Sequence, residues 1–464
     1  MSESTVTVSG GSVTLGRSAV RERRPQGGAP SELVTPRRLL WSAYAGLIVC
    51  GLATVLCTGS TPQLSPDNLH LAFAATFPHI YAGPLANLGP DIHLGGVIAL
   101  FTVMCVCYAT IVRHGSLLPA RAVVAGIVAL HLIVAIAPPL MTTDVFSYLM
   151  YGRMDAVYHI DPYIHGPWAI HYDSYFPFVA AQWAYTPTAY GPLFTGVSTL
   201  LGHLDIRTAT LVYKLLTVAC SLIAIGGVAK AAQRLGRDAA QAALLVGLNP
   251  VLIIYAVGGS HNDMLMMAAL SWSIAALVAH RARTAGGLLV TAVAVKLTAG
   301  VLLPFALAAR RGPAGRTRLG GHQWRMLGGA ALVLLGVAVI STVLFGAGPL
   351  HLLHTLEVIQ SNGGRQSVPG FIAWGLGFGW LSHGVVIGLQ AIDVLTFVWL
   401  IVAVRKHKID WITATGWAVV ALLVTSTFLL PWYVVWLLPF AALSDSRALR
   451  TAAIVLTAIG MTSL

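Results

Sequence analysis

The stretch LLWSAYAGLIVCGLATVLC, residues 39–57, is apolar throughout and contains no charged side chain. A helix needs about 20 such residues to cross the core of a bilayer. Similar runs recur along the chain, and short basic clusters such as residues 405–408 separate them. Backbone polar groups in lipid must be satisfied within each segment, so these runs predict helices, whereas a β-barrel would show short alternating strands. We therefore predict an all-α polytopic membrane protein with about 10–13 transmembrane helices.

The composition agrees with lipid as the main solvent. Of 464 residues, 56% are hydrophobic and only 9% are charged, against about 25% charged residues in a soluble domain. The formal net charge of +12 comes from Arg and Lys in a positive-inside arrangement, so it does not indicate a nucleic-acid partner. The five cysteines fall in predicted spans, with neither CxxC spacing nor a disulfide framework.

The chain divides into a tail and a membrane domain. Residues 1–36 are polar, without periodicity and without the apolar core of a signal peptide, so we expect a disordered cytoplasmic tail. Residues 37–464 form the transmembrane domain, which we place in the plasma membrane as a multi-pass protein. Two polar stretches, 141–187 and 347–381, are expected to be large loops on the extracytoplasmic side, because they are flanked by spans whose other ends are basic.

Three segments do not predict simple spans. Residues 188–204 are short and rich in glycine, and a full span there would place the basic cluster at 230–237 outside, so we favour a partial dip. Residues 284–309 carry Lys296 in mid-run and have basic residues at both ends, which indicates a helical hairpin entering from the cytoplasm. Residues 431–464 contain two short apolar runs, and we interpret the aromatics of the first run as packing or interface residues.

Asp144 is the best candidate for chemistry. It lies in MTTDVFSY, residues 141–148, at the expected outer mouth of a span. A carboxylate at a half-dry membrane boundary is functional by default, and there it could accept a proton from an attacking hydroxyl. The structural alternative is that Asp144 caps the helix that follows it.

Other residues could contact a substrate. His261-Asn262-Asp263 follows two glycines at a span boundary and could bind hydroxyls or phosphate, or cap the next helix. Lys296 and Lys214, buried in apolar runs, could hold a lipid-linked phosphate, and snorkelling to an interface is the alternative. Tyrosines near turns could stack on a sugar or form an interfacial belt. The substrate-binding candidates are Tyr148, Arg153, Tyr163, Tyr190, His261, Asn262, Asp263, Lys296 and Arg365. We propose no metal ligands, because no second His or carboxylate has helical ligand spacing.

Five motifs resemble a known family in their order and approximate spacing. They are TTDVFSYLMYGRMDAVYHIDPYIHGP (142–167), TPTAYGPLF (186–194), LNPVLIIYAVGGSHNDMLMM (248–267), VAVKLTAGVLLPF (293–305) and LPWYVVWLLPF (430–440). This pattern, over about residues 93–445, is similar to the actinobacterial polyprenyl-phosphomannose-dependent α(1→6)-mannosyltransferases, which build the mannan core of lipomannan and lipoarabinomannan. The carboxyl-terminal portion is shorter than expected of the mycobacterial members, so the resemblance does not define the acceptor.

The resemblance implies a GT-C glycosyltransferase with its active site at the outer face of the membrane. Its donor would be polyprenyl-phosphate-mannose, its acceptor a mannan or lipoglycan, and no cofactor or metal would be needed. Asp144 matches the catalytic acid of such enzymes, which would deprotonate the acceptor 6-hydroxyl for an inverting attack. The family pattern also favours roles for His261, Asp263 and Lys296.

Alternative functions remain at this point. Related GT-C enzymes transfer arabinose or other sugars from lipid phosphates. A transporter or flippase of lipid-linked saccharides would show paired halves and ionisable groups at mid-membrane, but this chain has no internal repeat and its acids gather in one loop. A non-catalytic scaffold would tolerate the loss of Asp144.

Overall fold

In the computed structural model, the described residues are 31–64, 85, 88–309, 320–361, 367–378 and 381–462. Within these ranges the secondary structure is helical and contains no β-strand, which confirms the all-α prediction. The α-helices are α1 (Ser31–Cys57), α3 (His93–His114), α4 (Ala120–Ala135), α5 (Asp144–Ala156), α6 (Pro192–Leu201), α7 (Ile206–Arg234), α8 (Ala239–Gly247), α9 (Asp263–Val278), α10 (Ala282–Val295), α11 (Leu302–Ala308), α12 (Gly321–Phe345), α13 (Leu352–Ser361), α14 (Val368–Gly375), α15 (His383–Arg405), α16 (Trp411–Thr425), α17 (Leu438–Leu443) and α18 (Arg447–Thr462).

Long apolar helices confirm a multi-span membrane protein. Five segments are long and apolar enough to cross a bilayer: Pro36–Cys57, His93–Leu117, Ile206–Arg234, Gly321–Phe345 and His383–Arg405. Shorter apolar helices pack between them. Many large apolar side chains on the long helices are exposed, for example Leu332 on α12 and Leu395 on α15. Such a surface is stable in lipid and not in water.

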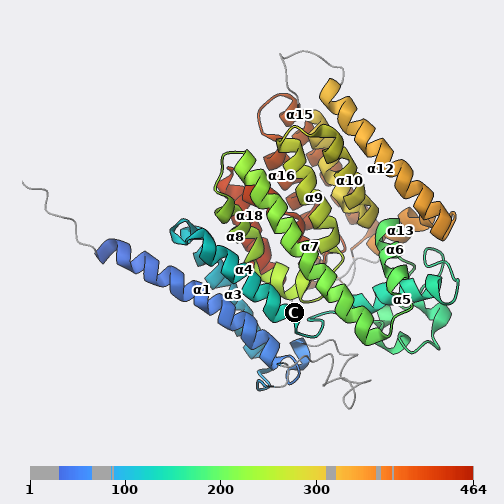
Figure 1. Ribbon diagram of the computed structural model, residues 1–464, viewed down its shortest axis with the longest axis horizontal. Helices are drawn as coiled ribbons and strands as arrows, with labels where there is room; N and C mark the ends of the chain where they lie inside the picture. The colour runs from blue at the N-terminus through green and yellow to red at the C-terminus, as the bar shows by residue number, and fades with distance from the viewer. Residues whose placement is uncertain are drawn as a thin grey trace, which may run out of the picture.

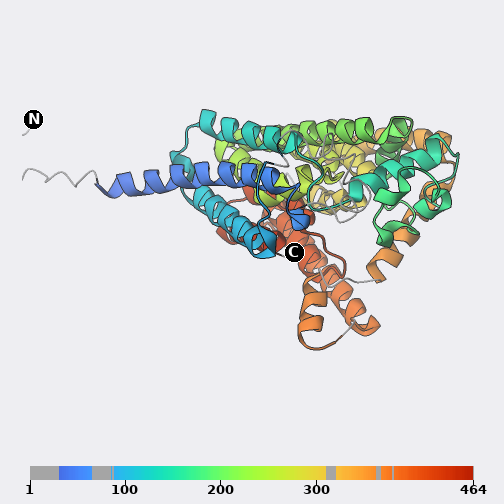
Figure 2. The same ribbon diagram turned by 90° about the horizontal axis from the view of Figure 1, so that it is seen from below.

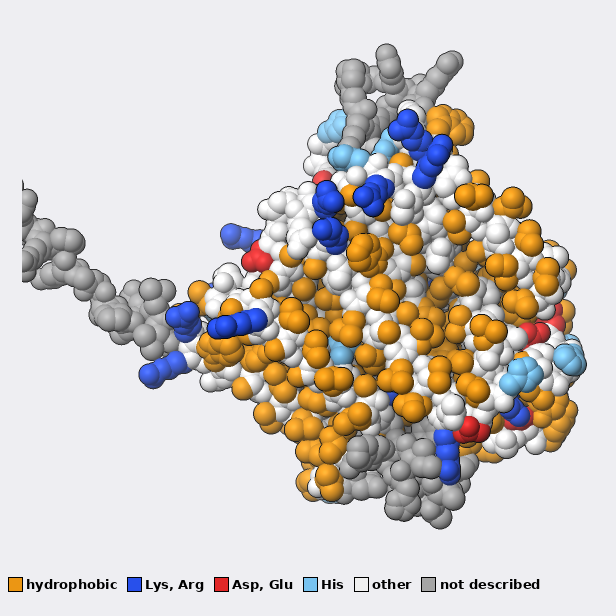
Figure 3. Space-filling view, in the orientation of Figure 1, with side chains coloured by type: hydrophobic (Ala, Val, Ile, Leu, Met, Phe, Trp, Pro, Cys, Tyr) orange, Lys and Arg blue, Asp and Glu red, His pale blue; other side chains and the backbone are white. Residues whose placement is uncertain are grey.

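The helices form a bundle with two distinct ends. Four helices lie side by side: α7 packs against α9, α9 against α10, and α10 against α12. Helices α1, α3 and α4 pack at one side of the bundle (Figure 1). Seen from below, α14 and α15 project from the rest of the bundle (Figure 2). Arg and Lys gather along the upper and left edges in Figure 3, apolar atoms cover the middle, and acidic and His side chains gather at the lower right, where α5 lies.

Residues 188–204 enter the bundle only partly, as the sequence predicts. Helix α6 has ten residues, and it packs against α5 so closely that a Cβ on Gly152 would lie 1.9 Å from the Ser198 carbonyl oxygen. Helix α7 begins four residues after α6 ends, at the same end of the bundle as α5. The basic residues at 230–237 therefore lie at the opposite end, as the partial dip requires.

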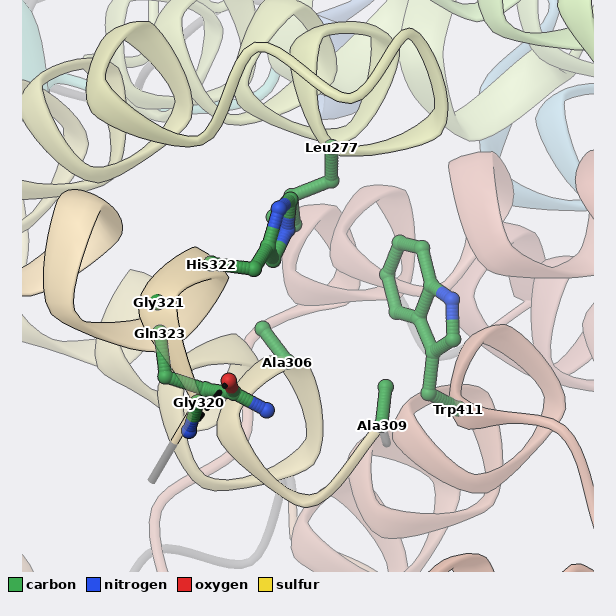
Figure 4. Close-up of a pocket in the computed structure, with 8 residues that line it drawn as sticks. All are labelled: Leu277, Ala306, Ala309, Gly320, Gly321, His322, Gln323 and Trp411. Atoms are coloured by element: carbon green, nitrogen blue, oxygen red, sulfur yellow. Dashed lines mark hydrogen bonds between the residues drawn. The ribbon is translucent and has the colours of Figure 1, made fainter. Parts of the chain in front are cut away.

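Residues 284–309 have the predicted shape of a helical hairpin. Helix α10 runs inward to Val295, the backbone turns through a 3-10 segment at Leu297–Val301, and α11 returns. Ala309, just after α11, and Leu277, near the end of α9, line the same cavity from opposite sides, so both ends of the hairpin lie at one end of the bundle (Figure 4). Lys296 is at the apex.

Some predicted boundaries differ from the structure. Helix α1 begins at Ser31, so the last residues of the predicted disordered tail, 31–36, are helical, and residues 1–30 lie outside the described part. The predicted loop 141–187 is folded into α5 and three 3-10 turns. The predicted loop 347–381 contains α13 and α14, because its apolar residues can form short amphipathic helices.

Candidate active site

A cavity of about 380 Å³ lies beside α5, and we call it the α5 cavity. Its walls come from α5, the segment 183–190, the hairpin apex, α13, the end of α16 and the 3-10 segment Pro431–Trp436. The charged side chains that line it are Asp144 and Lys296. Enclosed, mostly apolar cavities with a few convergent polar groups are the usual form of small-molecule sites.

Helix α5 presents one face to this cavity. Asp144, Ser147, Tyr148 and Tyr151 line the cavity, and their spacing of three and four residues places them in one row along the helix. Asp144 is the first helical residue, and the N-cap residue Thr143 makes no side-chain capping bond. The capping alternative for Asp144 is therefore wrong, and its carboxyl group is directed to the cavity.

Two strained turns bring Asp144 and His261 together. Met141 has a φ of 65° and Ser260 a φ of 59°, values that L-residues rarely adopt. Strain of this kind is stored where the surrounding structure enforces it, most often at functional sites. The two turns are joined by the Leu140 amide, which donates to the Gly258 carbonyl at 2.9 Å. A π-helix, Leu252–Val257, leads into the second turn, and such segments are also frequent at functional sites.

Lys214 fixes these turns in place. Its ammonium group donates to the Pro138 carbonyl at 2.6 Å and to the Gly258 carbonyl at 3.2 Å. The residue is only 2% exposed, so it does not snorkel to an interface, and it does not line the α5 cavity. Its role is structural, because two backbone carbonyls already compensate its charge.

His261 lies behind the carboxyl group of Asp144. Its Nδ1 is 3.7 Å from Asp144 Oδ2 and 3.2 Å from the Tyr148 hydroxyl. Its ring stacks on Trp432 with 3.6 Å between the ring centroids. Asn262, the N-cap residue of α9, makes no side-chain capping bond. The sequence His261-Asn262-Asp263 is therefore used for packing and site geometry, and not to cap α9.

Burial changes the acidity of the candidate base. Asp144 is 7% exposed, and this loss of hydration raises the pKa of Asp144 to about 6. The hydrogen bond with Thr142 and the positive charge of Lys296 act in the opposite direction and are weaker. Burial, and secondly the charge of Lys296, lower the pKa of His261, so His261 is neutral and does not compete as a cation. Carboxyl groups with a pKa near the working pH are suited to general-base catalysis.

Lys296 stands in an aromatic cage at the hairpin apex. Its ammonium group is 2.9 Å and 3.1 Å from the two carboxylate oxygens of Asp263. It lies over the rings of Tyr433, Trp436 and Tyr190, at 4.5, 5.1 and 5.9 Å from the ring centroids. The Trp436 indole N–H donates to the same Asp263 carboxylate. The cage positions the ammonium group of Lys296 at the wall of the cavity, where it can meet an anion.

The remaining walls of the α5 cavity are mostly apolar, with Gln360 and Ser426 as polar members. They come from α13, α16 and the segment after α16, and include Leu356, Ile359, Leu422, Leu423, Phe428 and Leu429. The predicted loop 347–381 thus contributes an apolar wall through α13. A site with a charged centre and an apolar wall suits an amphiphile, a molecule with an anionic head and a hydrocarbon chain.

Five predicted site residues do not line the cavity: His261, Asn262 and Asp263 lie behind its wall, and Arg153 and Tyr163 are bound elsewhere. The guanidinium of Arg153 binds Asp173, with Nη2 2.6 Å from Oδ2, and donates to the Gly202 carbonyl at 3.0 Å. The Tyr163 hydroxyl is buried and bonds to the Tyr190 carbonyl and to Thr195. Arg153 and Tyr163 therefore brace the outer segment against α6 and do not line the α5 cavity. Arg365 lies outside the described residues.

Four aromatic residues of the cavity wall were not expected from the sequence. Trp183, Trp432, Tyr433 and Trp436 all line the α5 cavity, although aromatics at span borders are usually interfacial. A signal was present in Pro431, which ends regular helix at membrane depth. Irregular backbone there is tolerated only where it is buried or lines a cavity. In the described part of the chain, no group of His, Cys, Asp or Glu is arranged to hold a metal ion.

The all-α fold, with five apolar helices of membrane-spanning length among the described residues, defines a polytopic membrane protein of the GT-C class. The profile of glycosyltransferase family 87, a GT-C family, matches residues 188–461. The profile described as "Alpha-(1->6)-mannopyranosyltransferase, N-terminal domain" matches residues 43–311. The chain therefore belongs to the α-(1→6)-mannopyranosyltransferase family.

Curated relatives agree with this assignment. α-(1→6)-Mannopyranosyltransferase A of Corynebacterium glutamicum is 34% identical over 177 residues, which are 36% of this chain and 35% of the relative. A probable α-(1→6)-mannopyranosyltransferase of Mycolicibacterium smegmatis is 30% identical over 378 residues, 70% of this chain and 65% of the relative. The chain thus spans about one third to two thirds of the length of these relatives. No solved structure matches the chain.

Proposed function

We propose that this protein transfers mannose from polyprenyl-phosphate-mannose to an α-(1→6)-mannan or lipoglycan acceptor, with inversion at the anomeric carbon. The observation that carries the proposal is that Asp144 and Lys296 line the same cavity. A base and a cation are thus brought together in a site that is largely shielded from water. The names of the relatives, all α-(1→6)-mannopyranosyltransferases, support mannose as the sugar. The apolar wall suits the polyprenyl chain.

In the proposed step, the acceptor 6-hydroxyl donates its proton to the Asp144 carboxylate. The oxygen then attacks the anomeric carbon of the donor from the face opposite the phosphate. A new glycosidic C–O bond forms while the bond between the anomeric carbon and the phosphate oxygen breaks, and polyprenyl phosphate leaves with the bonding electron pair. A positioned base of this kind contributes roughly 10²–10⁴-fold to a rate.

Lys296 is proposed to meet the negative charge that develops on the leaving phosphate. Its stem and the aromatic cage fix the ammonium group, and Asp263 holds it from behind. Fixed charges aimed at developing charge lower the barrier without reorganisation during the reaction. Because the lipid monophosphate can be met by a side chain in this way, the proposed reaction needs no metal or cofactor.

The remaining predicted residues have supporting roles in the proposal. Tyr148 and His261 hold the carboxyl of Asp144 in position, and Tyr190 lines the site beside Lys296. Asp263 positions Lys296, and Asn262 fills the turn between Asp263 and His261. Arg153 and Tyr163 have no substrate-binding role in this proposal, because their polar groups are already bound within the protein.

We propose that the α5 cavity opens on the extracytoplasmic side of the plasma membrane. Basic residues mark the opposite end of the bundle, among them Arg113 at the end of α3, Arg121 at the start of α4 and Arg405 at the end of α15. By the positive-inside rule that end faces the cytoplasm. The tail would then be cytoplasmic, as expected from its arginines.

The experiment that tests the function compares two matched Asp→Asn variants of α5. Asp144→Asn removes the proposed base, whereas Asp155→Asn changes a carboxyl group on the same helix that accepts from Thr199 and does not line the cavity. Membranes receive radiolabelled polyprenyl-phosphate-mannose and an α-mannoside acceptor, with a parallel panel of other lipid-phosphate sugars such as arabinose.

We expect Asp144→Asn to bind donor but to lose transfer by roughly 10²–10⁴-fold, and Asp155→Asn to transfer at close to the wild-type rate. Transfer by Asp144→Asn near the wild-type rate would refute the assignment of the base. Transfer from another lipid-phosphate sugar but not from the mannose donor would refute mannose as the sugar.

A further inference from the structure

Two hydrogen-bonding groups in the wall of the α5 cavity have no partner among the described residues. They are the hydroxyl of Ser147 and the indole N–H of Trp183. Ser147 is 3% exposed, and both atoms are shielded from solvent. A buried polar group that makes no hydrogen bond costs free energy, so native proteins keep few of them, and often for a function. The other unpartnered buried groups of the described residues, such as those of Asn262 and Tyr213, do not line this cavity.

Both groups are next to the candidate base. Ser147 follows Asp144 by one helical turn on the cavity face of α5. The Trp183 indole makes no hydrogen bond of regular geometry with Asp144, yet it is close enough to that carboxyl to lower its pKa. Trp183 is anchored by its ring, which packs edge-on against Phe428 at 6.0 Å between centroids. The two residues therefore line the same cavity from two different elements.

We propose that Ser147 and Trp183 form a subsite for the hydroxyl groups of a pyranose ring beside the reacting centre, and that they determine sugar specificity. This inference rests on the proposed glycosyl transfer. The indole is a donor only, so it must bind an oxygen that can accept, whereas the Ser147 hydroxyl can donate and accept. A sugar carries neighbouring hydroxyls that satisfy both demands. A hydrocarbon chain would satisfy neither group, whereas a phosphate would accept from both but would leave the acceptor capacity of Ser147 unused.

The pairing also accounts for discrimination against sugars that lack a hydroxyl. A site built to bond a substrate hydroxyl rejects the analogue without it, because its own buried groups stay unpaired. The pyranose ring is that of the donor or that of the acceptor. Both rings present neighbouring hydroxyl groups to the two residues. Single-deoxy analogues of each sugar separate these sources.

The test measures kcat/KM for mannose transfer in wild type, Ser147→Ala and Trp183→Phe, with native substrates and with single-deoxy donors and acceptors. Ser273→Ala is the matched control for the serine, because Ser273 is buried outside the cavity and its hydroxyl is bound to the Ala285 carbonyl. Trp168→Phe is the control for the tryptophan, since that residue is exposed in the same outer segment. Thermal unfolding in detergent checks that each variant folds.

We expect each variant to lose about tenfold in kcat/KM with native substrates. With the analogue that lacks the recognised hydroxyl, the same variant should lose almost nothing further, which is the signature of a direct interaction. The inference is overturned if variant and deoxy effects multiply independently for every hydroxyl of both sugars, or if the variants match wild type. Failure of wild-type membranes to transfer mannose at all would instead overturn the proposed function.

Discussion

The protein has a cavity at each end of its bundle, and the two differ in chemistry more than in size. The α5 cavity holds a base, a caged lysine and an apolar wall. The second cavity, of about 230 Å³, lies among Leu277, Ala306, Ala309, Gly320, Gly321, His322, Gln323 and Trp411 (Figure 4). The described residues of its lining include no carboxylate or ammonium group. The convergence of charged groups, and not the presence of a hollow, therefore identifies the candidate active site.

After Asp144→Asn, the largest expected effect follows from Lys296→Met. The loss of the cation from the α5 cavity should lower transfer by about 10²–10³-fold, because the leaving phosphate loses its counter-charge. The single change also leaves Asp263 buried without its partner. The double variant Lys296→Met/Asp263→Asn keeps the site neutral and serves as the folding control. Transfer by this double variant at wild-type rate would show that the lysine is structural.

The pH dependence tests the base without any substitution. The pKa of Asp144 is raised to about 6 by burial, and only the ionised carboxylate can accept a proton. We therefore expect kcat/KM to be flat above this pH and to fall about tenfold per unit below it. The measurement is a profile of transfer from pH 4.5 to 8 on membranes. A profile that is flat from pH 5 to 7 contradicts Asp144 as the group that titrates.

Arg153→Met should affect stability and not transfer. Its guanidinium is bound to Asp173 outside the α5 cavity, so its loss leaves a buried carboxylate unpaired and lowers the free energy of unfolding by about 3 kcal/mol. Thermal unfolding in detergent and transfer per folded molecule are measured together. Asp173→Asn in the same background should restore part of the stability. A selective rise in the donor KM would mean that Arg153 contacts substrate after all.

The smallest effect is expected in the second cavity. His322→Ala removes the one titratable side chain among the described residues of its lining, and we expect transfer to stay within about twofold of wild type. The assay is the same membrane transfer reaction. A large loss there would break the distinction between the two cavities and would point to a ligand at the basic end of the bundle.

The sequence singled out three ionisable residues that are costly to bury, two in the lining of the α5 cavity and one behind it. Asp144, Asp263 and Lys296 stand out in apolar runs, because an ionised group in a membrane domain needs a partner. Their mutual distances depend on the strained turns at Met141 and Ser260, and nothing in the residue pattern specifies those turns. Arg153 looked equally promising, but its partner Asp173 is 20 residues away and meets it only through the folding of the outer segment.

The aromatic cage was harder to predict. Trp and Tyr at span borders serve as interfacial anchors in most membrane proteins, so the aromatics after Pro431 gave no specific signal. The hairpin that carries Lys296 was predictable from basic residues at both of its ends. The approach of the two, with Lys296 over Tyr433 at 4.5 Å, is a tertiary contact between segments more than 130 residues apart.

The charges around Lys296 have a consequence for the order of events during turnover. With both carboxyls ionised, Asp144 and Asp263 outnumber the single ammonium group, so the empty site carries an excess of negative charge. An anionic donor adds to that excess and must raise the pKa of Asp144, which couples substrate entry to proton uptake. The acid limb of kcat should then lie at higher pH than that of kcat/KM, since the first reports the loaded enzyme and the second the free enzyme.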